Sequence, residues 1–338
     1  MAWGLLLCSN LTAPHLHPSS ALPSQILLHG CFRGTPAAWR SRRRPTISGR
    51  SGGFLLGRRL PFRGPAPCTV KKGNDVSPAE GWPSRRMLQA ALWAAEAVYI
   101  LWLFLLPYAP QGDPVWAIKL DTINDIAGLS LNFFFILPLL NTVGIHVLEA
   151  PVLHPMAEGL FNFVIGWTLL FAPLLFTDCQ RDRYKGSLDL LWGFQMFLTN
   201  TFLIPYMAMR LNDIDVKHSP SKQSQLGLLM TNGASFVGIA GGTVCLISTL
   251  WTIFGRSNMG FGGIADRWEF LERYVGSERL AYAFIWDICL YAIFQPWLIG
   301  DNLQNVKKNN EQIVRNLRFI PVVGLVAYLL SLDKENVL

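Results

Sequence analysis

Residues 279–303 read RLAYAFIWDICLYAIFQPWLIGDNL, and most of these residues are apolar. A helix needs about 20 consecutive apolar residues to cross the hydrocarbon core of a bilayer. The run 280–299 meets that length and holds a single charged side chain, Asp287, in its interior. Because lipid offers no hydrogen-bond partners to the backbone, such a run folds as a helix. The stretch therefore predicts a membrane-spanning helix with a carboxyl group at bilayer depth.

Further apolar runs of similar length occur on the N-terminal side, at 88–108, 123–145, 156–176, 188–209 and 226–254. A seventh run, 319–332, is shorter and holds Pro321 near its start, which is typical of a tilted span, a re-entrant segment or an interfacial helix. Only 15% of the residues are charged, against about 25% in a typical soluble domain. The sequence predicts an all-α, polytopic transmembrane bundle of six or seven spans over residues 75–338.

Residues 1–74 differ from the rest of the chain in charge. They contain nine Arg, two Lys and no Asp or Glu, which leaves 18 basic against 22 acidic residues in the remainder. The basic balance thus belongs to this leader, and nucleic acid is excluded as a partner of the body. Abundant Ser, Pro and Arg without acids is typical of a transit peptide, although a basic tail that stays attached would look similar. We expect 1–74 to be a disordered chloroplast transit peptide and 75–338 to lie in a chloroplast membrane, either thylakoid or inner envelope.

Asp287 is part of a polar face. Tyr291 and Gln295 follow it at i+4 and i+8, so all three project from one side of a helix. Glu96 lies in the middle of the first span in the same way. Two interpretations stay open, because ionisable residues at bilayer depth commonly face a bundle interior. Either Glu96 and Asp287 line a hydrated cavity that binds a cation, a proton or a polar headgroup, or they bond neighbouring helices and set their register.

Small residues recur every four positions in the fifth span, at Ala234, Gly238 and Gly242. Such a face allows a neighbouring helix to approach closely. The pattern predicts a helix-packing surface, within one chain or between two copies.

A metal or cofactor site has little support. His146, Glu149 and His154, followed by Glu158, are the weak candidates for metal ligands. Two prolines between the first and last of them prevent one continuous helix from presenting all four, so we interpret the segment as a polar connector. The body has no phosphate-binding glycine motif and no serine-hydrolase or zinc-protease motif. We therefore expect no metal and no cofactor, and any catalysis would rely on carboxyl groups acting as acids or bases.

The segments ERLAYAFIWDICLYAIFQPWLIGDNL and RFIPVVGLVAYLL carry a resemblance to known proteins. The body resembles multi-pass plastid membrane proteins of plants and cyanobacteria. The last 60 residues or so are similar to the plastid factors required for neoxanthin formation, whose C-terminal PVG element corresponds here to Pro321, Val322, Val323 and Gly324. The spacing differs and the N-terminal spans do not match. The resemblance implies a carotenoid-related role and transfers no catalytic residue.

Three classes of function follow from these observations. The first is a transport, assembly or scaffolding component that contacts membrane lipids and other plastid membrane proteins or pigments. The second is a membrane-embedded enzyme or accessory factor that acts on an isoprenoid or carotenoid, with Glu96 and Asp287 as acid and base. The third is an ion or proton pathway. With no recognisable catalytic motif, the sequence favours a non-enzymatic role.

Overall fold

The computed structural model describes residues 81–107, 112–213 and 223–333. The predicted leader, 1–74, lies outside these ranges. Within them the regular structure is helical, without a β-strand, and one isolated bridge pairs Val306 with Leu332. The all-α prediction is confirmed for the described part of the chain.

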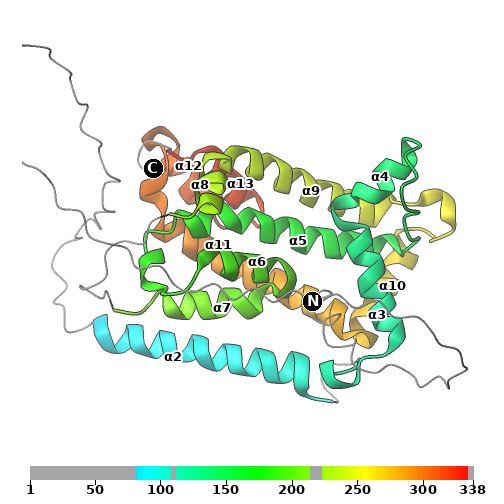
Figure 1. Ribbon diagram of the computed structural model, residues 1–338, viewed down its shortest axis with the longest axis horizontal. Helices are drawn as coiled ribbons and strands as arrows, with labels where there is room; N and C mark the ends of the chain where they lie inside the picture. Colours follow the sequence, from blue (N-terminus) through cyan, green and yellow to red (C-terminus); the bar gives the residue numbers. More distant parts are fainter. Residues whose placement is uncertain (1–80, 108–111, 214–222, 334–338) are drawn as a thin grey trace, which may run out of the picture. The chain divides into compact units, whose positions relative to one another are not determined.

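Figure 1 shows how the helices are arranged. The α-helices are α2 (Gly81–Ile100), α3 (Leu120–Leu131), α4 (Ile136–Thr142), α5 (Pro155–Phe176), α6 (Leu188–Leu198), α7 (Asn200–Met209), α8 (Gln225–Asn232), α9 (Ala234–Phe254), α10 (Ile264–Ser277), α11 (Arg279–Asp301), α12 (Glu311–Leu317) and α13 (Val323–Leu330). A π-helical turn, η1 (Leu101–Leu105), continues α2, and the short helix η2 spans Val115–Ala117. The other short helical turns are η3 (Phe133–Phe135), η4 (Arg181–Arg183), η5 (Ser257–Met259), η6 (Leu303–Asn305) and η7 (Lys308–Asn310).

Five helical segments in the described ranges are long and apolar enough to cross a membrane: Ser84–Leu105, Leu120–Thr142, Pro155–Phe176, Ala234–Met259 and Arg279–Asp301. The sequence predicted six or seven, and the difference lies in two runs. The run 188–209 is divided at Thr199 into α6 and α7. The run 319–332 contains only α13, with eight residues. A helix of that length extends about 12 Å, well short of a hydrocarbon core of about 30 Å.

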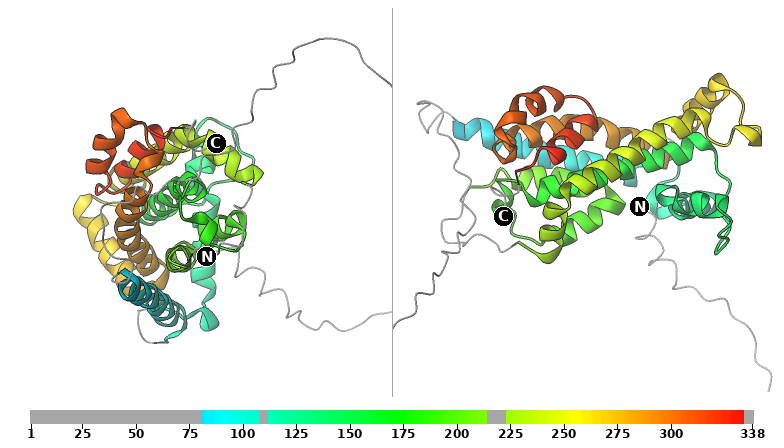
Figure 2. Two further views of the ribbon diagram at one scale, coloured as in Figure 1. Left: turned by 90° about the vertical axis from the view of Figure 1, so that its left-hand side faces the viewer. Right: turned by 90° about the horizontal axis from the view of Figure 1, so that it is seen from above.

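Helix α5 is the central helix. Of its most apolar stretch, 83% is buried inside the protein, against 22% to 44% for the other four long segments. Helix α9 runs alongside it, as Figure 2 shows, and glycines set the close approach of the two helices. A Cβ atom added at Gly159 would lie 2.8 Å from the carbonyl oxygen of Ser248, and one added at Gly241 would lie 2.7 Å from Leu170. These contacts leave no room for a side chain at either position.

The small-residue face of α9 receives the short helix α13. A Cβ atom added at Gly238 would lie 3.1 Å from the Cβ of Leu329, and one at Gly242 would lie 2.8 Å from Val326. Ala234, at the start of the same helix, is fully buried. In the structure this face is thus occupied by another helix of the same chain.

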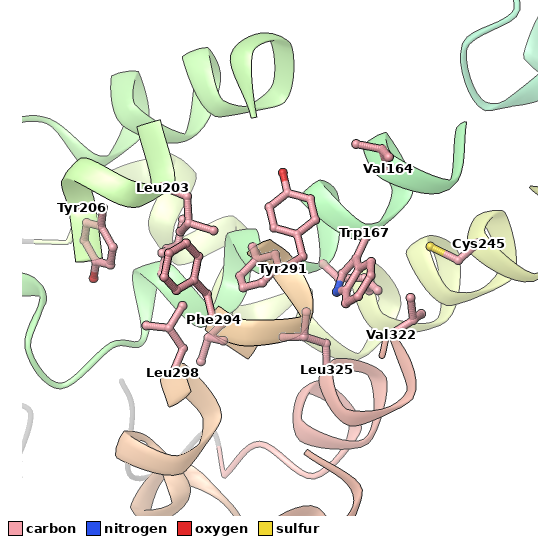
Figure 3. Packing of buried hydrophobic residues seen from close by; sticks show 14 of the residues in the cluster. Val164, Trp167, Leu203, Tyr206, Cys245, Tyr291, Phe294, Leu298, Val322 and Leu325 are labelled. Atoms are coloured by element: carbon pink, nitrogen blue, oxygen red, sulfur yellow. The ribbon is translucent and has the colours of Figure 1, made fainter. Parts of the chain in front are cut away.

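The core joins helices that are distant in sequence. Figure 3 shows Tyr291 and Leu298 of α11 together with Trp167 of α5, Tyr206 of α7 and Leu325 of α13. All five side chains are fully buried. Helix α11 therefore packs on one side against the central helix and on another against the C-terminal helix.

A buried ion cluster, here called the Asp178 cluster, follows the end of α5. Arg210 donates from Nε and Nη2 to the two carboxylate oxygens of Asp178, at 2.9 and 2.8 Å, and from Nη1 to Asp301, at 2.8 Å. The Tyr206 hydroxyl and the Asn302 amide also donate to Asp178, at 2.6 and 2.9 Å. The side chains of Asp178 and Arg210 are both 0% exposed. The cluster ties α7 and the end of α11 to the end of the central helix.

Candidate ligand cavity at Asp287

The break between α6 and α7 brings two polar side chains to α11. Thr199 has φ 44° and ψ −115°, a conformation that ends α6 and begins α7. A non-glycine residue at positive φ is uncommon, and such strained backbone tends to occur at functional sites. The Thr199 Oγ1 donates a hydrogen bond to Asp287 Oδ1 at 2.7 Å, and the adjacent Asn200 Nδ2 donates to the same oxygen at 2.8 Å.

A third donor reaches the same carboxyl oxygen from α2. The Tyr99 hydroxyl lies 3.1 Å from Asp287 Oδ1. Asp287 is 1% exposed, and within the described ranges it forms no ion pair. An oxygen that accepts three hydrogen bonds carries no proton of its own. Asp287 is therefore held through Oδ1 by three neutral groups, and its second oxygen is the one that can face a ligand.

Asp287 forms part of the wall of a cavity of ≈350 Å³. The cavity, here called the Asp287 cavity, is lined by Ile126, Leu129, Ser130, Phe133, Phe161, Ile165, Met196, Phe197, Thr199, Leu280, Ala283, Phe284 and Asp287. Phe197 is 45% exposed, so the cavity reaches the protein surface. Its lining is apolar apart from Ser130, Thr199 and the carboxyl group.

A second discontinuous helix borders the same cavity. Helix α3 ends at Leu131, and Phe134 and Phe135 take positive φ values of 53° and 56° before α4 begins. Asn162 of α5 accepts a hydrogen bond from the backbone N–H of Phe134 at 2.6 Å. The turn sets Phe133 in the cavity wall. Both interrupted helices therefore contribute residues to the wall of the Asp287 cavity.

A buried ion pair supports this second turn from the start of α5. Arg256 donates to the Glu158 carboxylate from Nε at 2.9 Å and from Nη2 at 2.7 Å, and Trp251 Nε1 donates to it at 2.8 Å. Asn132, which precedes the turn, also donates to Glu158. Glu158 is 0% exposed. These four residues, here called the Glu158 cluster, join the turn, the central helix and the end of α9.

Two of the weak metal candidates, His154 and His146, make other contacts. His154 Nδ1 accepts a hydrogen bond from the backbone N–H of Met156 at 3.2 Å, which caps α5, and its ring stacks on Phe270 with centroids 3.5 Å apart. Burial, together with Arg267 and Arg273, lowers the pKa of His154 to about 4, so the ring is neutral near pH 7. His146 contacts Asn141. Among the described residues, no group of three His, Cys, Asp or Glu side chains could hold a metal ion.

Glu96 and Asp287 are not brought together at the cavity. Glu96 is 5% exposed, its Oε2 has no hydrogen-bond partner among the described residues, and it is absent from the cavity wall. Tyr99, one turn further along α2, is the residue that reaches Asp287. The α2 side chain that contacts Asp287 is therefore the hydroxyl of Tyr99, whereas the sequence suggested the carboxyl group of Glu96.

The polar face of α11 has different partners along its length. The Tyr291 hydroxyl lies 2.6 Å from Thr168 Oγ1 of the central helix. The Gln295 carbonyl oxygen accepts from Trp167 Nε1 and from the backbone N–H of Val322, at 3.0 and 3.1 Å. Its amide nitrogen donates to the carbonyl oxygens of Arg318 and Ile320, at 2.9 and 2.8 Å. Gln295 thus holds the turn that leads into α13, whereas Asp287 borders the cavity.

The residues that the sequence did not single out are Thr199, Asp178 and Arg210, whereas Asn200 counted there only as one of several inward-facing amides. Thr199 and Asn200 lie inside an apolar run without a glycine or proline at the break. One weak signal for Thr199 and Asn200 is that they are adjacent polar residues in this run. Two adjacent side chains can both reach one partner only where the helix is interrupted.

Comparison with family models, with curated proteins and with solved structures finds no significant match for this chain.

Proposed function

We propose that this protein is an integral membrane protein of the plastid that binds an apolar, hydroxyl-bearing lipid of the isoprenoid class in the Asp287 cavity. The observation that carries the proposal is a mostly apolar cavity with one carboxyl group in its wall. Ligand sites are commonly apolar, with a few polar groups that orient the ligand. The apolar body of the ligand fits the lining, and its hydroxyl donates to the carboxyl oxygen of Asp287.

Binding of this kind suits a carrier or an accessory factor that presents a lipid to a partner. Acid–base catalysis by two carboxyl groups has less support, because Glu96 lies outside the cavity wall. An ion or proton pathway also has less support, because the lining offers few groups that could replace the hydration shell of an ion. The isoprenoid class is favoured by the resemblance of the C-terminal segment to factors of neoxanthin formation.

Ligand binding can be tested in nanodiscs by titration with retinol, a fluorescent isoprenoid alcohol. Asp287→Asn is expected to weaken retinol binding about tenfold. Thr199, Asn200 and Tyr99 hold the remaining oxygen of the new side chain, so an amide N–H₂ donor replaces the second carboxyl oxygen that accepts from the ligand hydroxyl. Farnesol should compete with retinol, and farnesyl methyl ether, which has no hydroxyl donor, should compete poorly.

Glu96→Gln is the matched control, since it makes the same chemical change at a buried acid outside the cavity wall. It should leave the affinity for retinol unchanged. Equal retinol affinity in wild type and Asp287→Asn, or equal competition by farnesol and its ether, would contradict the proposal.

The plastid location rests on the composition of residues 1–74, which carry eleven basic and no acidic side chains. Fusion of residues 1–80 to a fluorescent protein should direct it into isolated chloroplasts, with removal of the leader on import. The control fusion replaces the nine arginines with glutamine and should stay outside. A fusion that remains full-length outside the organelle, or enters mitochondria instead, would refute the location.

A further inference from the structure

The hydrogen bonds of three polar side chains decide which polar groups of a ligand suit the wall of the Asp287 cavity. These side chains are Ser130 of α3, Thr199 at the break between α6 and α7, and Asp287 of α11. A hydroxyl group has one hydrogen to donate and two lone pairs that accept. Where that hydrogen already has an acceptor inside the protein, only the lone pairs are left for a ligand.

Thr199 and Asp287 form one acceptor position. The Thr199 hydroxyl donates its hydrogen to Asp287 Oδ1 at 2.7 Å, so it offers the cavity no donor. Oδ1 also accepts from Asn200 and Tyr99, which leaves Oδ2 of Asp287 as the acceptor for a ligand. This is the position at which the proposed function places the hydroxyl group of the ligand.

Ser130 forms a second acceptor position, on a different helix. Its Oγ donates to the backbone carbonyl oxygen of Ile126 at 2.7 Å, one turn earlier in α3. Serine hydroxyls inside helices often bond in this way to the carbonyl group four residues before them. Donation from Ser130 to a ligand would first break this bond, whereas acceptance from a ligand leaves it intact.

The same wall is poor in hydrogen-bond donors. Within the described ranges, none of its side chains carries an N–H group. Interrupted helices leave backbone N–H groups without helical partners, but the N–H of Thr199 donates to the Gln195 carbonyl oxygen at 2.8 Å and that of Phe134 to Asn162 Oδ1 at 2.6 Å. The carbonyl or ether oxygen of a ligand would therefore be buried here without a donor, which is unfavourable.

We infer that the ligand of the Asp287 cavity is a diol, with one hydroxyl group that donates to Asp287 and a second, elsewhere on the same apolar body, that donates to Ser130. The inference rests on the proposed binding of a hydroxyl-bearing lipid and adds the second hydroxyl and the residue that accepts it. The cavity then distinguishes the diol from its ketone, because a hydroxyl group donates a hydrogen bond and a carbonyl group only accepts one.

The experiment compares twelve-carbon competitors of retinol on the full-length protein in nanodiscs. They are dodecan-1-ol, the dodecanediols with a second hydroxyl at carbon 4, 6, 8 or 10, and the ketones made by oxidation of that second hydroxyl. Affinities are referred to the concentration of each probe in the bilayer, because a second hydroxyl lowers partitioning into lipid.

In wild type, at least one diol is expected to bind about fivefold more tightly than dodecan-1-ol, the gain from one net hydrogen bond. Its ketone should bind less tightly than dodecan-1-ol, since its carbonyl oxygen finds no donor. A series in which no diol binds more tightly than dodecan-1-ol would overturn the inference.

Substitution of Ser130 tests the second position. Ser130→Ala removes the acceptor oxygen and keeps a good helix former. It should bind dodecan-1-ol as wild type does and lose the advantage of the diol, whereas Ser130→Thr, which keeps a hydroxyl oxygen, should retain most of that advantage. A diol that keeps its full advantage in Ser130→Ala would overturn the inference.

The probe series also separates the inference from the proposed function. Failure of dodecan-1-ol to compete would reject the hydroxyl site at Asp287, whereas competition by dodecan-1-ol without a gain from any diol would reject only the second hydroxyl. If Ser130→Ala does not fold, the comparison of the best diol with its ketone in wild type carries the test. Equal affinities of these two probes would contradict a second acceptor in the wall.

Discussion

Replacement of Arg210 by Met is expected to lower the free energy of unfolding by about 3–5 kcal/mol, because it leaves the buried Asp178 carboxylate without its cation. Both side chains are 0% exposed and are joined by two hydrogen bonds. Tyr206 and Asn302 would still donate to Asp178, but neither carries a charge. The measurement is reversible unfolding in mixed micelles, followed by tryptophan fluorescence.

The control is Arg315→Met, which removes an arginine from the exposed i,i+4 pair with Glu311. Exposed pairs contribute about 0.5 kcal/mol or less, so this variant should unfold close to wild type. The double variant Asp178→Leu with Arg210→Met should recover part of the loss, because a buried ion pair can be replaced by apolar residues at little cost. A loss equal to that of Arg315→Met would show that the Asp178 cluster does not stabilise the fold.

The same cluster predicts a pH dependence of stability. Burial raises the pKa of Asp178. The positive charge of Arg210 and the hydrogen bonds from Arg210, Tyr206 and Asn302 lower it by more, so the pKa of Asp178 lies below its ordinary value. A carboxyl group with a lowered folded-state pKa stabilises the fold above its unfolded pKa of about 3.9 and loses that contribution as pH falls through the folded pKa. Wild type should therefore lose stability below about pH 4, and the steepness of this loss should decrease in Arg210→Met.

Replacement of Arg256 by Met is expected to cost a similar 3–5 kcal/mol and also to weaken ligand binding. Arg256 is the cation of the Glu158 cluster, in which Glu158 is 0% exposed. Through Asn132 the cluster supports the turn between α3 and α4, and this turn sets Phe133 in the wall of the Asp287 cavity. The affinity for retinol should fall although Arg256 itself is absent from that wall.

Arg273→Met is the control for Arg256, since Arg273 pairs with Glu269 on the exposed face of α10, where the two side chains are 72% and 69% exposed. It should change neither stability nor retinol affinity. If Arg256→Met lowers the stability but leaves the affinity for retinol unchanged, the Glu158 cluster does not support the wall of the Asp287 cavity. Unchanged stability would contradict the assignment of the cluster as a buried ion pair that stabilises the fold.

Much of the fold could be predicted from local sequence patterns. The run 280–299 predicted α11 to within two residues at either end, because a continuous apolar segment has no alternative to a helix in lipid. The small residues at 234, 238 and 242 indicated a close helix contact, although the identity of the partner, α13, came from the structure. The run 188–209 was misleading, since its apolar composition fits one span. At its division Thr199 donates a hydrogen bond to Asp287 on another helix, a contact that the run itself does not reveal.

Spacing along the chain was enough to predict the all-helical class and the common face of Asp287, Tyr291 and Gln295. It did not predict the interruptions at Thr199 and at Phe134 and Phe135. Which of the three polar residues on the common face borders a cavity and which holds a turn depends on how the helices pack, and spacing along the chain does not give this. Thr199 and Asp287 are 88 residues apart, and Glu158 and Arg256 are 98 apart. Such pairs form because helix packing brings buried polar groups to hydrogen-bonding partners. The pattern of residues along the chain does not specify which helices become neighbours.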